Sequence, residues 1–171
     1  MKKPKVVLKN VRTFEGHDGL GLNADVWIDG IKCMHLYDGA YGGEYEYTNF
    51  TYDNPKAEQV KANIAKLEAY VKTLPAEEWD FHGKKMSIEP NMDTFLNNIF
   101  EAMQLEKKMK NAILVGIPNG TSYQRISWKG KALSAVPLGA LQMTVNSLKK
   151  KLKTGEVILN TNLEALGVVS N

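Results

Sequence analysis

The first third of the chain alternates between apolar and polar positions, which is typical of β-strands with one buried face. The alternating runs cover residues 6–14, 24–37 and 44–52. Within the second run, Asp29-Gly30 separates two segments rich in β-formers, and this dipeptide is the usual signal of a two-residue type I′ hairpin. The pattern predicts an antiparallel meander of three or four strands within residues 5–52.

The middle of the chain changes to apolar residues at three- and four-residue spacing, which predicts helices. Two helices are expected, at residues 56–74 and 91–110, and Asn91 is a suitable N-cap for the second. The segment between them is predicted to be a polar connection anchored by Trp79 and Phe81.

The last third combines both patterns. Residues 112–128 contain two short apolar or alternating runs around Pro118-Asn119-Gly120, which predicts a second hairpin. A third helix is expected at 138–153, with its lysines in the last turn, where the helix dipole favours cations. A short strand at 156–159 and one helical turn at 163–166 complete the chain.

These elements predict the α+β class, because strands and helices are segregated along the chain. The expected fold is an N-terminal antiparallel meander packed against two or three helices, with a second β-hairpin in the C-terminal half. Residues 1–171 are expected to form a single domain, strand-rich over 5–52 and mixed over 55–171.

Composition indicates the class of protein and its compartment, but not an activity. The 171 residues are 43% hydrophobic and 24% charged, as in ordinary soluble globular proteins. Apolar runs fall far short of the length that a membrane span needs, and the N-terminal sequence lacks the apolar stretch of a secretory signal. Cys33 is the single cysteine, which suits a reducing compartment. We expect a cytoplasmic protein, either bacterial or viral in a bacterial host cell.

Charge is the strongest functional signal. No acidic residue occurs between Glu106 and Glu156, a stretch that carries ten basic residues. Such separation indicates an anionic partner, which could be nucleic acid, a nucleotide or an acidic protein, and we predict nucleic acid or a nucleotide ligand. Two aromatic residues within the stretch could stack on bases. The predicted ligand-binding residues are Tyr123, Arg125, Trp128, Lys129, Lys131, Lys149, Lys150, Lys151 and Lys153.

The composition of this basic stretch limits the prediction. Nine of its ten cations are lysine, whereas bidentate reading of bases in duplex DNA relies mainly on arginine. Specific duplex recognition is therefore not expected, and electrostatic attraction remains open. The alternative is a solvated lysine-rich surface without a ligand.

No pattern for catalysis, metal or cofactor binding stands out. His17, Cys33, His35 and Asp38 lie near the first hairpin, but they lack the spacing of a metal site, and we interpret Cys33 and His35 as strand residues. The glycine-rich segment 39–43 lacks the ending of a phosphate-binding loop and is expected to be a turn. Tyr45 and Tyr47 share a strand face and are either a binding platform or, as we expect, packing residues.

Three segments carry a resemblance: residues 23–32, Asp38-Gly39-Ala40-Tyr41-Gly42-Gly43, and residues 155–162. Together they resemble small uncharacterised proteins of bacteriophages and mobile elements, a group with no established activity. The resemblance implies a phage accessory protein, whose targets are often host defence machinery or nucleic acid.

The function predicted from sequence is thus a phage-type accessory binding protein that acts on an anionic partner through its lysine-rich C-terminal half. One alternative is an inhibitor that docks on a host defence protein. A further alternative is a small nucleotide or nucleic-acid hydrolase. No catalytic residue, metal or cofactor is assigned, and the chain is expected to be a binding protein rather than an enzyme.

Overall fold

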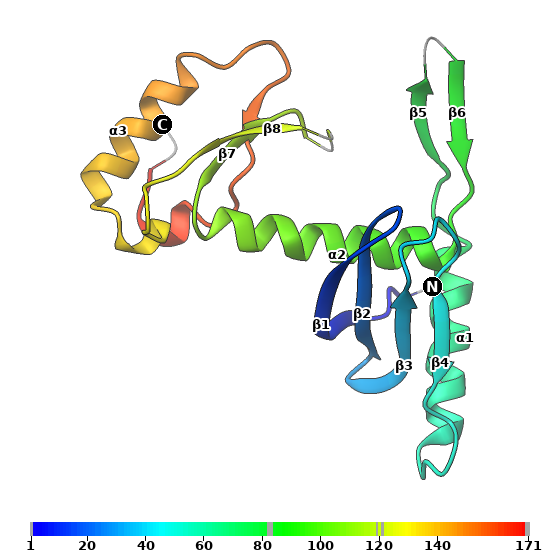
Figure 1. Cartoon of the computed structure of the whole chain (residues 1–171). Coiled ribbons are helices and arrows are strands. Elements are labelled where there is room, and N and C mark those ends of the chain that lie inside the picture. Colours follow the sequence, from blue (N-terminus) through cyan, green and yellow to red (C-terminus); the bar gives the residue numbers. More distant parts are fainter. Residues whose placement is uncertain (1, 82–83, 119, 121, 170–171) are drawn as a thin grey trace. The chain divides into compact units, whose positions relative to one another are not determined.

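The structure is a computed structural model that describes residues 2–81, 84–118, 120 and 122–169, without the side chains of residues 77 and 79–81. It combines an N-terminal four-stranded antiparallel sheet with helices and a small C-terminal sheet, which confirms the predicted α+β class (Figure 1). The fold divides into two compact units, Met1–Phe100 and Glu101–Asn171, here called the N-terminal and C-terminal units. That the whole chain forms a single domain stays a prediction.

The N-terminal unit contains the predicted meander. Strands β1 (Val6–Gly16), β2 (Gly19–Ile28), β3 (Ile31–Asp38) and β4 (Glu46–Asn49) form one antiparallel sheet in the order β1-β2-β3-β4. Ile28 pairs with Ile31, and Asp29 and Gly30 both have positive φ, at 49° and 86°. These angles suit the type I′ turn that the Asp-Gly dipeptide predicts.

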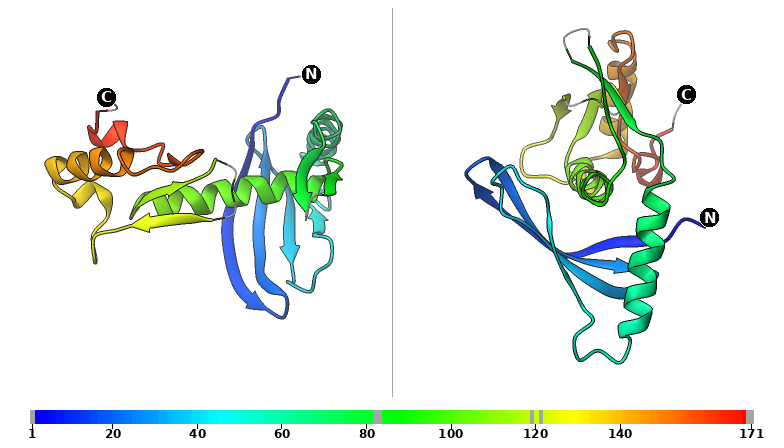
Figure 2. Two further views of the ribbon diagram at one scale, coloured as in Figure 1. Left: turned by 90° about the horizontal axis from the view of Figure 1, so that it is seen from above. Right: turned by 90° about the vertical axis from the view of Figure 1, so that its right-hand side faces the viewer.

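One face of this sheet forms the core of the N-terminal unit. Leu22, Ala24, Val26 and Ile28 alternate along β2 and are all buried. Helix α1 (Ala57–Val71) contacts β2 and β3 (Figure 2), and its buried residues are Val60, Leu67 and Val71.

The first turn of α2 (Met92–Met109) is tied to the same sheet. Asp93 accepts hydrogen bonds from the Tyr45 backbone N–H at 3.0 Å and from the Tyr47 hydroxyl at 2.6 Å. Asn91 caps this helix as predicted, because its Oδ1 accepts a hydrogen bond from the Thr94 N–H at 2.9 Å.

The segment between α1 and α2 differs from the prediction of a polar connection. It contains β5 (Glu77–Phe81) and β6 (Lys84–Ile88), which pair as an antiparallel hairpin. Backbone pairing explains the difference, since strands need no apolar face to form ladder hydrogen bonds. The predicted anchoring by Trp79 and Phe81 concerns side chains that lie outside the described residues.

The C-terminal unit is built around β7 (Ile113–Gly116). This strand lies between β8 (Tyr123–Ile126) and β9 (Val157–Ile158) in a three-stranded antiparallel sheet, and β7 with β8 confirms the predicted second hairpin. Asn119, in the predicted turn, is outside the described residues. Short 3₁₀ turns at Leu133–Ala135 and Glu164–Leu166 flank the unit's last helix in sequence.

Two apolar clusters cover the two faces of this small sheet. On one face, Ile113 packs with Leu141 and Val145 of α3 (Leu138–Lys149). On the other, Leu114 packs with Met109 of α2 and with Ala112. Because neighbouring residues of a strand point to opposite faces, β7 contributes to both clusters.

Helix α3 ends at Lys149, so the predicted helix end at residue 153 is wrong. In a longer helix, the side chains of Lys149 and Lys153 would be neighbours on one face, and like charges at this spacing destabilise a helix. Gly155, at φ 83°, then turns the chain toward β9.

Candidate anion-binding surface of the C-terminal unit

The boundary between the two units is also a boundary in charge. Residues 1–100 hold 12 basic and 15 acidic side chains, a net charge of −3, whereas residues 101–171 hold 10 basic and 4 acidic side chains, a net charge of +6. All ten basic side chains of the C-terminal unit are exposed. The positive charge predicted from sequence is therefore at the surface of one structural unit.

Most of these cations form no ion pair with a described residue. In the N-terminal unit, ion pairs hold Lys32 to Asp25, Lys61 to Glu58 and Lys66 to Asp29. In the C-terminal unit, nine of the ten basic side chains form no ion pair with any described residue, Lys149 being the one that takes part in a further interaction. These nine exposed charges are accessible to solvent and counterions.

The predicted binding lysines fall into two groups, toward opposite ends of β7. Lys129 and Lys131 follow β8 from Ile126, which pairs with Ile113 at the start of β7. The segment 149–153 instead leads into Val157, which pairs with Gly116 at the end of β7. The sequence left open whether the lysines form one face; the strand register separates them.

The two aromatic residues of the predicted site are partly used in packing. Tyr123 packs against the cluster of Met109 and Leu114, and the Lys108 Nζ lies 5.3 Å from its ring centroid. Trp128 is half-buried against the cluster around Ile113. Stacking of bases on these rings stays a prediction. Arg125 is exposed on β8, on the same sheet face as Tyr123.

The 149–153 segment, with four lysines in five residues, is the densest group of predicted binding residues. The Lys151 N–H donates to the Leu148 carbonyl at 2.8 Å, and the Lys153 N–H donates to Glu156 Oε2 at 2.9 Å. These bonds fix the backbone while the four ammonium groups remain exposed. Cations at the end of a helix are also favoured by its dipole.

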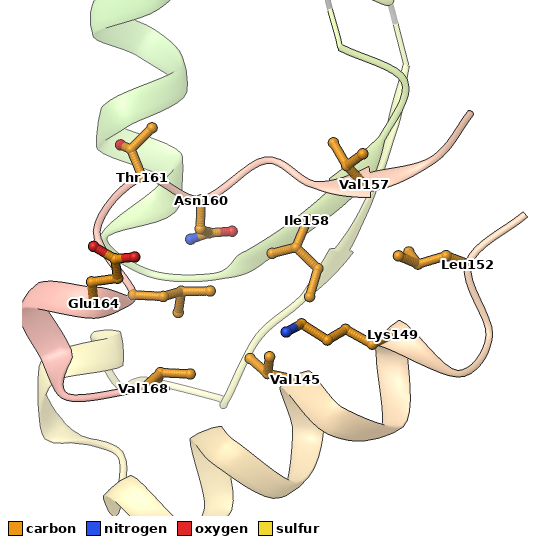
Figure 3. Close-up of a pocket in the computed structure, with 10 residues that line it drawn as sticks. Val145, Lys149, Leu152, Val157, Ile158, Asn160, Thr161, Glu164 and Val168 are labelled. Carbon is orange, nitrogen blue, oxygen red and sulfur yellow. The ribbon is translucent and has the colours of Figure 1, made fainter. Parts of the chain in front are cut away.

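A pocket of about 530 Å³ lies beside this segment (Figure 3). Its walls come from α3, β9 and the 3₁₀ turn at Glu164–Leu166, and they include Val145, Ile158 and Val168. Figure 3 shows the Lys149 amine pointing into the pocket between Val145 and Ile158, while the Glu164 carboxylate lies toward Thr161. Of the predicted binding residues, Lys149 alone lines the pocket. The sequence prediction missed the other lining residues. Apolar residues at this spacing also occur in a hydrophobic core, so their pattern does not indicate a pocket.

The side chain of Asn160 holds the backbone beside this pocket. Its Oδ1 accepts from the Leu114 N–H at 2.7 Å, and its Nδ2 donates to the carbonyls of Ala112 at 2.9 Å and Met109 at 3.3 Å. Asn162 Nδ2 also donates to the Met109 carbonyl, at 3.1 Å. Asn160 therefore joins the end of α2, the start of β7 and the segment after β9.

Of the candidate residues in the N-terminal unit, His35 takes part in a polar network with Asp25 and Asn23. His35 Nδ1 lies 3.2 Å from Asp25 Oδ1, and His35 Nε2 lies 3.2 Å from Asn23 Oδ1. Cys33 is buried, and burial raises the pKa of its thiol, which disfavours the reactive thiolate. Among the described residues, no group of three or more His, Cys, Asp and Glu side chains could hold a metal ion.

The tyrosine pair contacts α2. Besides the Tyr47 bond to Asp93, the Tyr45 hydroxyl donates to Asn97 Oδ1 at 3.1 Å. Burial, and then the Asp93 carboxylate, raise the pKa of Tyr47 well above its ordinary value. These contacts agree with the packing role expected for the pair.

No helix in the part of the chain that the structure describes is long and apolar enough to cross a membrane. Comparisons of the chain with protein-family models, curated proteins and solved structures found no match.

Proposed function

We propose that the protein is an accessory binding protein that captures a phosphate-bearing partner, single-stranded nucleic acid or a nucleotide, through its C-terminal unit. The observation that supports this most is the set of nine exposed cations that form no ion pair with a described residue. Phosphate groups would replace the counterions that these cations hold in the free protein.

Lys150, Lys151 and Lys153, together with Lys149, are the proposed main contact. Their flexible side chains act as point charges rather than as planar forks, so they favour phosphate charge over base identity. Arg125, Lys129 and Lys131 lie toward the Ile113 end of β7, away from the 149–153 segment. They would make secondary contacts with a longer nucleic-acid strand. The proposed site of action is the cytoplasm of a bacterial host.

The salt dependence of binding tests this proposal. We would titrate a fluorescently labelled single-stranded oligonucleotide with wild type and with Lys149/Lys150/Lys151/Lys153→Ala, following anisotropy at several salt concentrations. Each neutralised phosphate of a single strand contributes about 0.7 to the slope of log affinity against log salt, so four lost contacts lower the slope by about 3. A shallow wild-type slope, or equal slopes, would contradict the proposal.

Failure of wild type to bind oligonucleotides and nucleotides even at low salt would overturn the proposal. Docking on a host protein, the competing prediction from sequence, would then be the function to test.

A further inference from the structure

The pocket beside Lys149 has the size and lining of a small-molecule site. Its volume of about 530 Å³ lies within the range of about 300–1,000 Å³ that is usual for ligand pockets. It is formed entirely within the C-terminal unit, by residues between Val145 and Val168.

The walls of this pocket are mostly aliphatic. Of the ten described lining residues, six are aliphatic: Val145, Leu152, Val157, Ile158, Leu163 and Val168. None of the described residues that line the pocket is aromatic, so these residues offer a nucleobase no stacking partner. An alkyl chain, in contrast, gains from contact with aliphatic walls through removal of apolar surface from water.

One cation is directed into these apolar walls. Figure 3 shows the Lys149 amine pointing into the pocket, and no other Lys or Arg occurs among the lining residues that the structure describes. The neighbouring Lys150 and Lys151 add positive charge beside the pocket without lining it. Among the described lining residues, Glu164 carries the carboxylate, which lies toward Thr161 and would repel an anionic group on that side. The charges therefore fix the orientation of an amphiphilic anion, with its head at Lys149.

We propose that this pocket binds an aliphatic carboxylate, with the carboxylate on the Lys149 amine and the alkyl chain against the aliphatic walls. The ligand would compete with the interaction that Lys149 already makes within the protein. This inference goes beyond the proposed capture of phosphate-bearing partners, and it does not depend on whether an oligonucleotide binds.

Titration with decanoate below its micelle-forming concentration tests the proposal, with amide chemical shifts as the readout. We expect saturable shifts confined to residues that line the pocket, such as Val157, Thr161 and Val168. Acetate, which has the head alone, and decyltrimethylammonium, which has the chain with the opposite charge, should each bind at least about 10-fold more weakly, because the pocket needs both the apolar contact and the charge pair.

Two variants distinguish the effect of the Lys149 amine inside the pocket from the effect of positive charge nearby. Lys149→Met keeps an unbranched apolar side chain but removes the amine, and we expect decanoate affinity to fall by about 10-fold or more, as for loss of a charge-assisted hydrogen bond. Lys150→Met removes the same charge one residue away, outside the lining, and should change affinity less than about 2-fold. Equal losses in both variants, tight binding of the cationic amphiphile, or shifts that avoid the pocket would overturn the proposal. Oligonucleotide binding measured on the same samples reports separately on the proposed function.

Discussion

Replacing Asn160 should strongly destabilise the C-terminal unit, although Asn160 belongs to no helix or strand. Its amide satisfies the N–H of Leu114 and the carbonyl of Ala112, and both of these residues are fully buried. Asn160→Ala leaves both backbone groups without these partners. Each buried group left unsatisfied costs about 1–3 kcal/mol. Water can reach part of the half-buried Asn160 position, so we expect a loss of about 2–4 kcal/mol in the free energy of unfolding.

Denaturation by urea, followed by circular dichroism, measures this loss. Asn162→Ala is the control. It removes one donor to the Met109 carbonyl, which Asn160 also serves, and the Oδ1 that accepts from Asn160 Nδ2 at 3.1 Å, but it leaves the partners of Leu114 and Ala112 in place. We expect it to cost about 0.5–1.5 kcal/mol.

Asn160→Asp tests the donors separately from the acceptor. An aspartate still accepts from the Leu114 N–H, but it sets a charged oxygen against the Ala112 carbonyl in place of the amide donor. At pH 7 this variant should be at least as unstable as Asn160→Ala, with partial recovery under acid, where the protonated carboxyl can donate. A change of less than about 0.5 kcal/mol in Asn160→Ala, the range of ordinary surface substitutions, would refute the role assigned to Asn160.

Three further predictions concern the N-terminal unit. Burial tends to raise the pKa of Asp25, but hydrogen bonds from Asn10, Lys32 and His35 outweigh it and hold that pKa below its ordinary value. The extra free energy of unfolding of wild type over Asp25→Asn should therefore be present at pH 7, above the pKa of about 3.9 in the unfolded chain. It should vanish as the pH falls below the pKa of Asp25 in the folded protein, and a difference independent of pH would contradict this. Tyr47→Phe should cost about 1.5–3 kcal/mol in urea denaturation, because Asp93 loses a hydroxyl donor, and an unchanged midpoint would exclude that role. Asn91→Ala should cost about 0.5–2 kcal/mol through loss of the α2 cap, whereas Asn91→Ser should keep most of the stability.

Local signals explain which parts of the fold were predictable. The turn at Asp29-Gly30 and the cap at Asn91 depend on residues at most three positions apart, and the structure has both. The β5–β6 hairpin was missed because its strands carry polar residues and resemble a linker. Its register pairs residue 80 with Lys85, an acidic position opposite a basic one, so opposite charges on the two sides of the turn were an available signal.

The candidate site depends on contacts that local patterns do not encode. Asn160 meets Ala112 and Leu114 across 48 and 46 residues, and nothing near it in sequence distinguishes it from a loop asparagine. The pocket likewise joins α3 with β9 and the last 3₁₀ turn. The charge separation was visible in the sequence because it depends only on which residues are charged and not on how the chain folds. The division of the lysines between the two ends of β7, in contrast, could be seen only from the strand register.

The most direct test of the central claim compares two charge-matched variants for oligonucleotide binding at low salt. Lys149/Lys150/Lys151/Lys153→Ala removes four charges from the C-terminal unit, and Lys56/Lys72/Lys84/Lys85→Ala removes four exposed lysines from the N-terminal unit. Both variants have the same net charge, so a difference between them reports on position alone. If the C-terminal unit captures phosphate-bearing partners, the first variant loses at least about 10-fold in affinity, as expected for several lost phosphate contacts, and the second stays within about 3-fold of wild type. Equal losses in the two variants, or a larger loss in the second, would contradict the account.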